Sequence, residues 1–511
     1  MFDRRTFVAG ASLACSALAA PALAAIGDPI VSTRLGRVRG RREGGVSVFR
    51  GIRYGVAERF RAPRPAAPSS AITDAYAFRP SAPQRGRYEP QSEDCLFLNV
   101  WTPDARTGAK LPVMVYFHGG AYSNGSVVDP LNDGRHLAAN DAVCVTVNHR
   151  LNAFGYLYLA RLDTRFPDSG NNGQLDLILA LKWIRDNIAQ FGGDPSRVMV
   201  FGQSGGGAKI ATLMGMPAAA GLFHSAATMS GQQVTASGPL HATERAKAYL
   251  AGLKASPGEL LTMPVGKLVD ALDAIDPIMG GGVYFGPVLD MKWLTRHPFW
   301  PDANPLSNRV PMVLGNTHDE TRAFIPRERL AGLTWDNLAQ RMAPELKVDI
   351  LPEWVVAEYR RLFPSYTPEQ VFYAATTAGR SWRGQVEEAE ARARAATPTW
   401  VYQLDFPSPV DPWRGAPHML DIPLVFGTLD APGSITGTGA VSRAVSDAMM
   451  HAFISLAARG DPNAAGLPRW PMYRLDQRAT MIFDAPPRVE DDPRREQREL
   501  FARVPYIQPG T

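Results

Sequence analysis

A serine stands inside a cluster of glycines at the point where a buried strand pattern changes to a helical one. The segment VMVFGQSGGGAKIATLM, residues 198–214, contains the pattern G-x-S-x-G around Ser204. A serine on so sharp a strand-to-helix turn projects its hydroxyl above a sheet, and neighbours without a Cβ allow close approach of backbone and substrate. The following helix directs backbone N–H groups at the place where negative charge would develop. The segment therefore predicts a nucleophilic serine.

A serine hydroxyl needs a general base, and the base needs an orienting acid. When the nucleophile lies on a strand–turn–helix corner, the chain order is Ser204, then Asp or Glu, then His. His318 and His418 both lie in loops after later strand patterns, and His418 follows the last one. We expect His418 to be the base and His318 to be a neighbour of the acid. Asp319 and Glu320 are the two candidates for that acid.

The other histidines are excluded by their positions. His224 and His241 come before any further expected core strand, His297 lies in an expected insertion, and His451 lies in an apolar helix. The three that precede the serine do not fit the chain order: His118, His136 and His149.

A second glycine-rich corner precedes the serine. The segment VYFHGGAYSNGS follows a buried strand pattern and contains His118-Gly119-Gly120-Ala121. Small residues at such a corner leave backbone N–H groups free to bind an oxyanion, together with the N–H of Gly205. We therefore expect an oxyanion hole to be built from these two corners.

The elements that must position these residues alternate between strand and helix patterns, as an α/β fold requires. Continuous apolar runs of strand length are typical of strands buried on both faces. They lie at 112–117, 141–148, 198–202, 310–316 and 399–406.

Several other segments are assigned from their patterns. Apolar residues over 177–191 recur at helical spacing and stop at a glycine pair, which predicts a helix. Residues 31–55 alternate between glycine turns and favour an antiparallel hairpin at one edge of the sheet. The segment 451–463 predicts a late helix closed by Gly460. We interpret 203–309 as helical insertions over the carboxyl edge of the sheet.

Composition and charge exclude some classes of function. The 511 residues are 45% hydrophobic and 20% charged, with a formal net charge of +5. These values are ordinary for a globular protein with a large core. Arginines are spread along the chain among acidic residues, which favours solvated surfaces over a nucleic-acid-binding patch.

The first 25 residues are typical of an export signal. Arg4-Arg5 precedes an apolar stretch that begins at Phe7 and ends in small residues. The RRTF segment is typical of a twin-arginine signal, which implies transient contact with an export machinery and a location in the periplasm or outside the cell. No apolar run in the remaining chain is long enough to span a bilayer. We expect residues 26–511 to form a single domain.

Two cysteines remain after removal of such a signal, Cys95 and Cys144. A disulfide scaffold is excluded by this count. Either two free thiols or a single bridge between them is consistent with the sequence, and we expect free thiols.

Taken together, the motifs resemble the type-B carboxylesterase family, which includes cholinesterases, bacterial para-nitrobenzyl esterases and the non-catalytic neuroligins. The resemblance runs from about Val31 to about Asp484. The segments that carry it, in order, are SEDCLFLNVWTP, HGGAY, VNHRLNAFGYL, NNGQLDLILALKWIRDNIAQFGGDPSRVMVFGQSGGG, MSGQ, THDE, GAPHMLDIP and ARGDPN.

The resemblance implies an α/β-hydrolase fold with a mostly parallel central sheet flanked by helices, and helical insertions over the active site. It implies that Ser204 is the nucleophile, Glu320 the acid and His418 the base. It also implies that Gly120, Ala121 and Gly205 donate to the oxyanion. Ser230 takes the place of a family serine that supports the acid.

The chain departs from the family pattern at several positions. Gln203 precedes the nucleophile where the family usually has Glu, and Gly205 follows it where the family has Ala. Cys95 resembles one half of a family disulfide, but residues 26–94 contain no cysteine. Thr321 follows the acid where the family has Gly. In the family, the disulfide closes the loop that precedes the position of Cys95. That loop is short in this chain and lacks the tryptophan with which cholinesterases hold choline.

These observations predict a serine hydrolase that cleaves small carboxylic esters through an acyl-enzyme, without a metal or cofactor. Two alternatives remain. The same triad could hydrolyse amides, lactones or carbamates, or the chain could be a non-catalytic binding protein of the neuroligin type. We expect neutral, moderately apolar esters as substrates, with poor turnover of choline esters.

Overall fold

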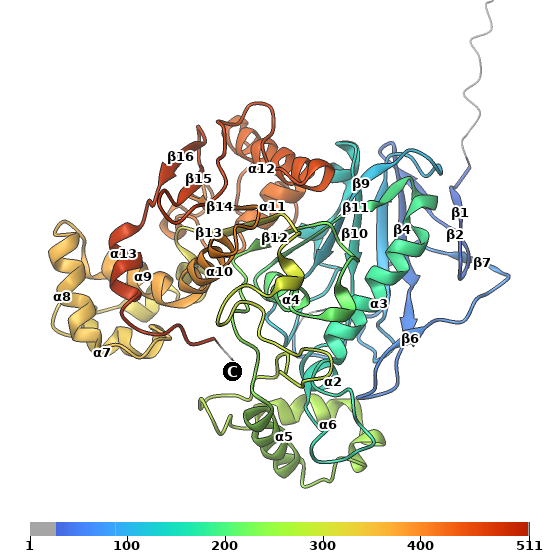
Figure 1. Cartoon of the computed structure of the whole chain (residues 1–511), viewed down its shortest axis with the longest axis horizontal. Helices are drawn as coiled ribbons and strands as arrows, with labels where there is room; N and C mark the ends of the chain where they lie inside the picture. The colour runs from blue at the N-terminus through green and yellow to red at the C-terminus, as the bar shows by residue number, and fades with distance from the viewer. Residues whose placement is uncertain (1–26, 87, 509, 511) are drawn as a thin grey trace, which may run out of the picture.

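The computed structural model describes residues 27–86, 88–508 and 510 of the chain. The expected export signal at 1–25 lies outside the described residues. The described residues form an 11-stranded sheet at the centre of the molecule, in the order β16-β15-β14-β13-β12-β11-β9-β10-β8-β4-β3 (Figure 1). These strands are β3 (Arg41–Glu43), β4 (Val46–Arg53), β8 (Phe97–Thr102), β9 (Leu111–Phe117), β10 (Val143–Val147), β11 (Gly193–Gln203), β12 (Ser225–Met229), β13 (Met312–Thr317), β14 (Thr399–Leu404), β15 (Ala479–Phe483) and β16 (Arg488–Asp491).

The strands from β10 to β15 in this order pair in parallel, and the outer strands pair antiparallel. Because successive side chains of a strand point to opposite faces, β9 contributes to two cores. Val113, Val115 and Phe117 pack in one hydrophobic cluster, whereas Met114 and Tyr116 pack in the other. The sheet is therefore buried on both faces, as the continuous apolar runs predict.

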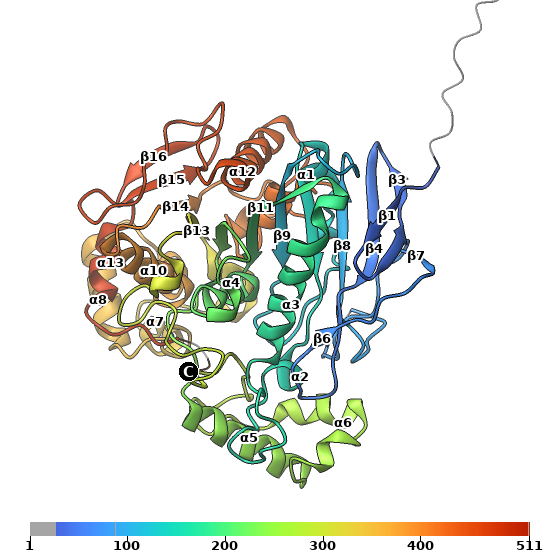
Figure 2. The same cartoon turned by 45° about the vertical axis from the view of Figure 1, so that its right-hand side comes forward.

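Helices cover both faces of the sheet (Figures 1 and 2). Apolar residues of α3, α4 and α10 belong to one core, and those of α1, α11 and α12 belong to the other. The helices are α1 (Arg135–Ala139), α2 (Asn152–Tyr156), α3 (Asn172–Asn187), α4 (Gly205–Leu213), α5 (Pro239–Leu253), α6 (Val265–Asp270), α7 (Leu338–Met342), α8 (Pro352–Leu362), α9 (Pro368–Thr377), α10 (Arg383–Arg394), α11 (Asp421–Phe426), α12 (Ala440–Arg459) and α13 (Arg495–Phe501).

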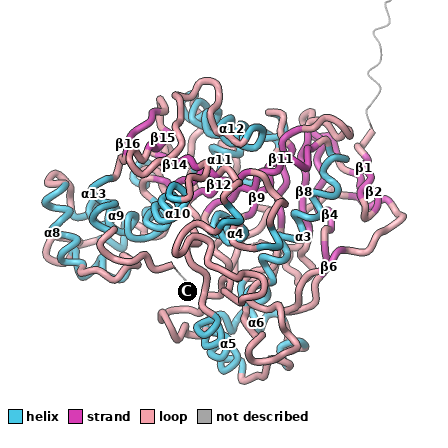
Figure 3. The backbone as a smooth tube through the Cα atoms, viewed as in Figure 1, coloured by secondary structure: helices cyan, strands magenta, loops and turns pink. Residues whose placement is uncertain are grey.

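Two further groups of helices lie beyond the sheet. The pair α5 and α6 lies at the bottom of the view in Figure 3, and α8, α9 and α13 lie at its left. Each group has a hydrophobic cluster of its own. Among the described residues, no helix combines the length and apolar character needed to cross a membrane.

The structure confirms the α/β fold and all five expected core strands, with ends shifted by a few residues. The expected helix at 177–191 is α3 followed by a 3-10 turn, and it ends at Gly192 with a left-handed φ of 83°. The late helix, α12, is also closed by a left-handed glycine, Gly460, but it begins at Ala440, well before the expected start at 451.

One expectation is corrected by the sheet. The segment 203–309 is not purely an insertion, because the core strand β12 lies within it between β11 and β13. The residues of β12, Ser-Ala-Ala-Thr-Met, are too small and too few to give a strand signal. His241 therefore follows a core strand after all, but it is exposed on α5.

The expected antiparallel hairpin at one edge of the sheet is confirmed. The strands β3 and β4, both within residues 31–55, pair antiparallel and form that edge. The strands β1 (Ile30–Thr33) and β2 (Gly36–Arg39) form a further hairpin, which joins β7 (Ile72–Asp74) in a separate three-stranded sheet. Alternation along the sequence predicts pairing but does not say which sheet a hairpin joins.

Candidate active site

Ser204 occupies the sharp turn between β11 and α4. Its backbone has φ 55° and ψ −125°, a conformation that non-glycine residues rarely adopt. The two glycines after it permit the turn. A Cβ on Gly206 would lie 1.9 Å from the carbonyl oxygen of Phe117, and a Cβ on Gly205 would lie 2.0 Å from that of Ala121. The glycines are therefore required because neighbouring backbone fills the space that any side chain would occupy.

His418 and Glu320 meet beside this turn. His418 lies in the loop between β14 and α11, and Glu320 lies just after β13. Nδ1 of His418 is hydrogen-bonded to Oε2 of Glu320. Glu320 is fully buried, and His418 is 7% exposed. The structure thus brings together the expected base and one of the two expected acids, although 98 residues separate them in the chain.

The other carboxylate oxygen of Glu320 is fixed by three donors. The hydroxyl of Ser230 donates to Oε1 over 2.5 Å, the backbone N–H of Thr317 over 2.9 Å and the amide of Asn316 over 3.1 Å. Burial by itself would raise the pKa of Glu320, but the neighbouring His418 and the hydrogen bonds from Ser230 and Thr317 outweigh burial and hold the pKa below its ordinary value. Glu320 is therefore placed to remain a carboxylate and to stabilise a positive charge on His418.

Asp319, the alternative acid, faces away from His418. Its Oδ2 accepts a hydrogen bond from the backbone N–H of Ala416 over 3.1 Å and lies 3.2 Å from Nδ1 of His318. Asp319 thus ties down the loop that carries His418, and His318 is its neighbour, as expected. Of the two adjacent carboxylates, only Glu320 is bonded to the candidate base.

Gln203 contacts the other side of the His418 ring. Nε2 of the Gln203 amide lies 3.0 Å from Nε2 of His418, and Gln203 is 1% exposed. The amide donates to the ring nitrogen that a base must use to take a proton from Ser204. Among the described residues, the hydrogen bond to that nitrogen comes from Gln203 and not from Ser204. To act as the base, the ring nitrogen would have to exchange its hydrogen bond with Gln203 for one with Ser204. Such a change is consistent with the general observation that catalytic hydrogen bonds are often completed only when substrate is bound.

The expected oxyanion loop lies against the same turn. Gly120 and Ala121 have left-handed φ values of 82° and 54°, and both line the cavity above Ser204. The buried ammonium of Lys209, on α4, donates to the carbonyl oxygens of His118 and Ala121 over 3.2 Å and 2.8 Å. The structure therefore places the expected donors of Gly120, Ala121 and Gly205 next to the nucleophile.

The cavity above Ser204 has a volume of about 490 Å³. This volume is within the range of small-molecule sites. Phe324 forms part of its wall and packs on His418, with 4.8 Å between the ring centroids. The guanidinium of Arg380 lies 4.3 Å from the centre of the Phe324 ring and also lines the cavity. On another part of the wall, Asp129 accepts a hydrogen bond from the hydroxyl of Tyr88 over 2.8 Å.

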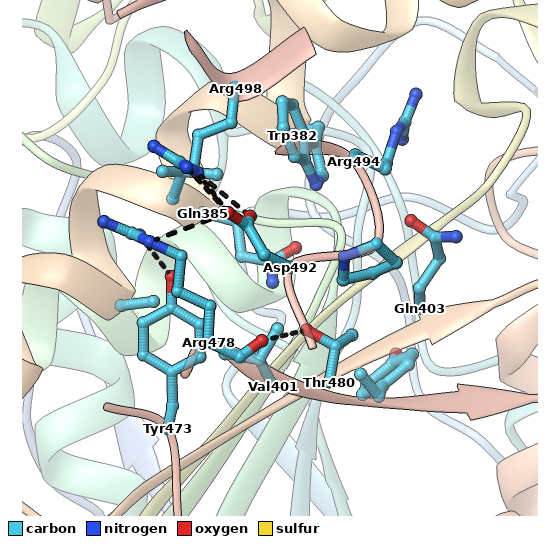
Figure 4. Close-up of a pocket in the computed structure, with 14 residues that line it drawn as sticks. Trp382, Gln385, Val401, Gln403, Tyr473, Arg478, Thr480, Asp492, Arg494 and Arg498 are labelled. Atoms are coloured by element: carbon cyan, nitrogen blue, oxygen red, sulfur yellow. Dashed lines mark hydrogen bonds and ion pairs between the residues drawn. The ribbon is translucent and has the colours of Figure 1, made fainter. Parts of the chain in front are cut away.

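A second cavity lies between α10, β14 and β15 (Figure 4). Its volume is about 30 Å³, which is about the space of one water molecule. Its arginines are engaged by neighbouring side chains, as when Arg498 pairs with Asp492 over 2.6 Å. It contains none of the expected site residues, so the cavity above Ser204 is the candidate active site.

Four residues of the site lay outside the sequence-based predictions: Asn316, Phe324, Arg380 and Lys209. Asn316 and Phe324 flank the THDE motif closely enough to have been suspected. Arg380 enters the cavity from a π-helical turn (Ala378–Trp382), where its φ of −95° and ψ of −111° break the helix. Such turns often occur at functional sites, but this one has no sequence signature.

Both cysteines of the described chain, Cys95 and Cys144, are buried and free. Burial raises the pKa of each thiol, so neither is a reactive thiolate at neutral pH. The structure thus agrees with the expectation of two free thiols.

A strained serine turn at the carboxyl end of a central parallel strand, with a buried Glu–His pair beside it, defines a serine hydrolase of the α/β-hydrolase class. Comparison with known proteins specifies the family. Residues 27–501 match the model of the Carboxylesterase family. The chain belongs to this family and is a carboxylic ester hydrolase of the type-B carboxylesterase group.

Curated relatives and solved structures agree. The chain is 34% identical to a para-nitrobenzyl esterase of Bacillus subtilis over 92% of this chain and 98% of the relative. It is 30% identical to a fumonisin B1 esterase of Sphingopyxis macrogoltabida, over 92% of this chain and 88% of the relative. A Geobacillus stearothermophilus carboxylesterase structure superposes with a TM-score of 0.82 and 34% identity, covering 92% of this chain and 99% of that one.

Proposed function

We propose that the protein hydrolyses carboxylic esters through an acyl-enzyme on Ser204, with His418 as base and acid and Glu320 as the residue that stabilises His418. The observation that carries this proposal is the buried hydrogen bond from His418 Nδ1 to Glu320, beside a serine on a strained turn. That bond leaves Nε2 of the ring without a proton, so that it can accept one from Ser204 once it exchanges its hydrogen bond with Gln203 for one with the serine.

The reaction follows from this geometry. Oγ of Ser204 attacks the ester carbonyl while His418 takes its proton, and backbone N–H groups of Gly120, Ala121 and Gly205 hold the oxyanion. The carbon–oxygen bond to the alcohol then breaks, and His418 returns the proton to the departing alkoxide. Water, deprotonated by His418, then attacks the acyl carbon. The bond between that carbon and Oγ of Ser204 breaks, His418 returns the proton to Oγ, and the carboxylic acid is released.

The charge of the cavity favours neutral esters. A substrate cation would find no carboxylate at Gln203, and Arg380 stands beside the Phe324–His418 wall. Asp129 carries the opposite charge but is engaged by Tyr88. We therefore propose neutral, moderately apolar esters as substrates. Hydrolysis of amides, lactones or carbamates by the same triad is the second candidate.

We also propose that residues 1–25 direct twin-arginine export and that residues 26–511 form one catalytic domain. The support is the sequence of the leader, with Arg4-Arg5 followed by an apolar stretch. Cell fractionation of the full chain and of an Arg4→Lys/Arg5→Lys variant tests this: the wild type should collect in the periplasm or medium, and the variant in the cytoplasm.

A fluorophosphonate probe tests the catalytic assignment. Peptide mapping should find the label on Ser204, and Ser204→Ala and His418→Ala should each lower kcat by roughly 10³-fold. Ser196→Ala changes an exposed serine at the far end of β11 and serves as the matched control. Label on another serine, or unchanged kcat in Ser204→Ala, would reject the proposal.

A panel of esters tests the substrate class. kcat/KM is compared for a choline ester and its uncharged carbon isostere, alongside the corresponding amide, lactone and carbamate. The neutral ester should be turned over as well as the choline ester or better. A wild-type preference for the cation of more than about tenfold would reject the proposed selectivity and would make Asp129 the residue to examine next.

A further inference from the structure

Lys209 is a buried cation that the proposed mechanism does not use. It lies on α4, five positions after Ser204, and is fully buried. Its ammonium donates to the carbonyl oxygen of His118 over 3.2 Å and to that of Ala121 over 2.8 Å. It also lies 5.4 Å from the centre of the Tyr122 ring. One side chain thus holds both ends of the short loop that carries the proposed oxyanion donors Gly120 and Ala121.

Two histidines lie near Lys209, and neither of them carries a charge. His118 stacks on His149 with 4.5 Å between ring centroids. Burial, followed by the nearby Lys209 charge, lowers the pKa of His118 to about 3, and burial and these neighbours also lower that of His149, so both rings stay neutral. Among the described residues, no carboxylate forms an ion pair with Lys209. Its bonding partners are the two loop carbonyls.

Burial of an amine at this position has a cost that an apolar residue would avoid. Burial lowers the pKa of Lys209 to about 7, although its two carbonyl acceptors favour the charged form. Both protonation states keep enough N–H groups to bond both carbonyls. Methionine or leucine would fill the same space without the free-energy cost of removing an amine from water. Neither residue could donate hydrogen bonds to the carbonyl groups of the loop.

Gly205 and Lys209 act on the same carbonyl group. The Ala121 oxygen, which Lys209 bonds, lies only 2.0 Å from where a Cβ on Gly205 would stand. The family usually has alanine at position 205. In this chain, the carbonyl group of Ala121 occupies the space that the methyl group of such an alanine would need. The glycine at 205 and the lysine at 209 are therefore complementary: one makes room for the Ala121 carbonyl, and the other binds it.

We propose that Lys209 is a positioning residue that holds the loop from His118 to Ala121 so that the N–H groups of Gly120 and Ala121 face the oxyanion formed at Ser204. The inference rests on the proposed ester hydrolysis at Ser204. Lys209 acts through the backbone of the loop. Its effect therefore belongs to the transition state, where the oxyanion exists, and not to binding of the neutral ester.

The test uses Lys209→Met, with Lys182→Met as the matched control, because Lys182 is an exposed lysine on α3. Active sites are counted with a fluorophosphonate, so that kcat refers only to folded enzyme. Lys209→Met should lower kcat by about 10²-fold with KM changed less than about threefold, and Lys182→Met should match the wild type. The affinity for a trifluoromethyl ketone, which mimics the oxyanion, should fall by the same factor as kcat/KM.

A purely structural role would instead lower yield and Tm while leaving kcat per labelled site and ketone affinity within about threefold of the wild type, and this result would overturn the inference. If Lys209→Met gives no soluble enzyme, Lys209→Leu, which also lacks a donor, is measured under the same criteria. Failure of the underlying function is distinguishable, because it appears as retained activity in Ser204→Ala.

A double-mutant cycle with Gly205→Ala tests the shared carbonyl group. In the wild-type background, the added methyl group should displace the clamped Ala121 carbonyl and lower kcat at least tenfold. In the Lys209→Met background, where the loop is released, the same change should cost less than about threefold. Equal costs in the two backgrounds would show that Lys209 does not hold the Ala121 carbonyl in that place.

Discussion

The contact between Gln203 and His418 leads to a specific prediction about pH dependence. The amide nitrogen of Gln203 lies 3.0 Å from Nε2 of His418, and both side chains are buried. Gln203→Glu places a carboxylate at the same distance from the ring. A neutral amide can donate to a neutral imidazole, whereas a carboxylate favours the protonated imidazolium, which cannot act as a base. The variant should therefore need a higher pH to become active.

The size of the effect follows from Coulomb's law. The 3.0 Å contact joins the outer atoms of the two groups, and the centres of the carboxylate and imidazolium charges would lie about 5 Å apart. At an effective dielectric constant of about 20 such charges attract by about 3 kcal/mol, which corresponds to roughly 2 pH units. Water in the cavity reduces this attraction, so we expect the acid limb of the kcat/KM profile to move up by about 1–2 pH units. At alkaline pH the two enzymes should differ by less than about threefold.

The assay is kcat/KM for a neutral nitrophenyl ester between pH 5 and 9, at low and at moderate salt. Gln203→Met, which has a similar size and no charge, is the matched control and should leave the position of the acid limb unchanged. An acid limb of Gln203→Glu that coincides with that of the wild type would refute the reasoning, since it would mean that residue 203 does not contact His418 in the working enzyme.

Two further predictions follow from the site and the core. Glu320→Gln should lower kcat by roughly 10³–10⁴-fold, because the amide cannot stabilise the imidazolium, whereas Asp319→Asn should lower it less than about tenfold, and the reverse ranking would make Asp319 the acid. Thiol titration of residues 26–511 without reductant should detect Cys95 and Cys144 only after denaturation, as two thiols, and mild reductant should leave Tm unchanged. A count of zero would instead mean a disulfide between them.

Much of the fold and of the site was predictable from local patterns. The parallel strands are continuous apolar runs because both faces of the sheet are buried. The turn at Ser204 is recognisable in the sequence because only glycine fits at the neighbouring positions. The candidate base, His418, could be chosen by chain order, and the structure places it beside Glu320. Short strands without branched or aromatic residues, such as β12, escaped detection because their stability comes from the strands on either side and not from their own composition.

The sequence by itself indicated the class of chemistry, the family and the chain order of the candidate catalytic residues. The position of the motif left Asp319 and Glu320 open, and the family resemblance favoured Glu320. The tertiary structure shows Glu320, and not Asp319, hydrogen-bonded to His418, because adjacent side chains leave the chain in different directions. Only the tertiary structure joined Gln203 to His418 and Lys209 to the oxyanion loop. These contacts connect residues from 88 to 215 positions apart, a separation at which no local pattern carries information and packing alone sets the partner.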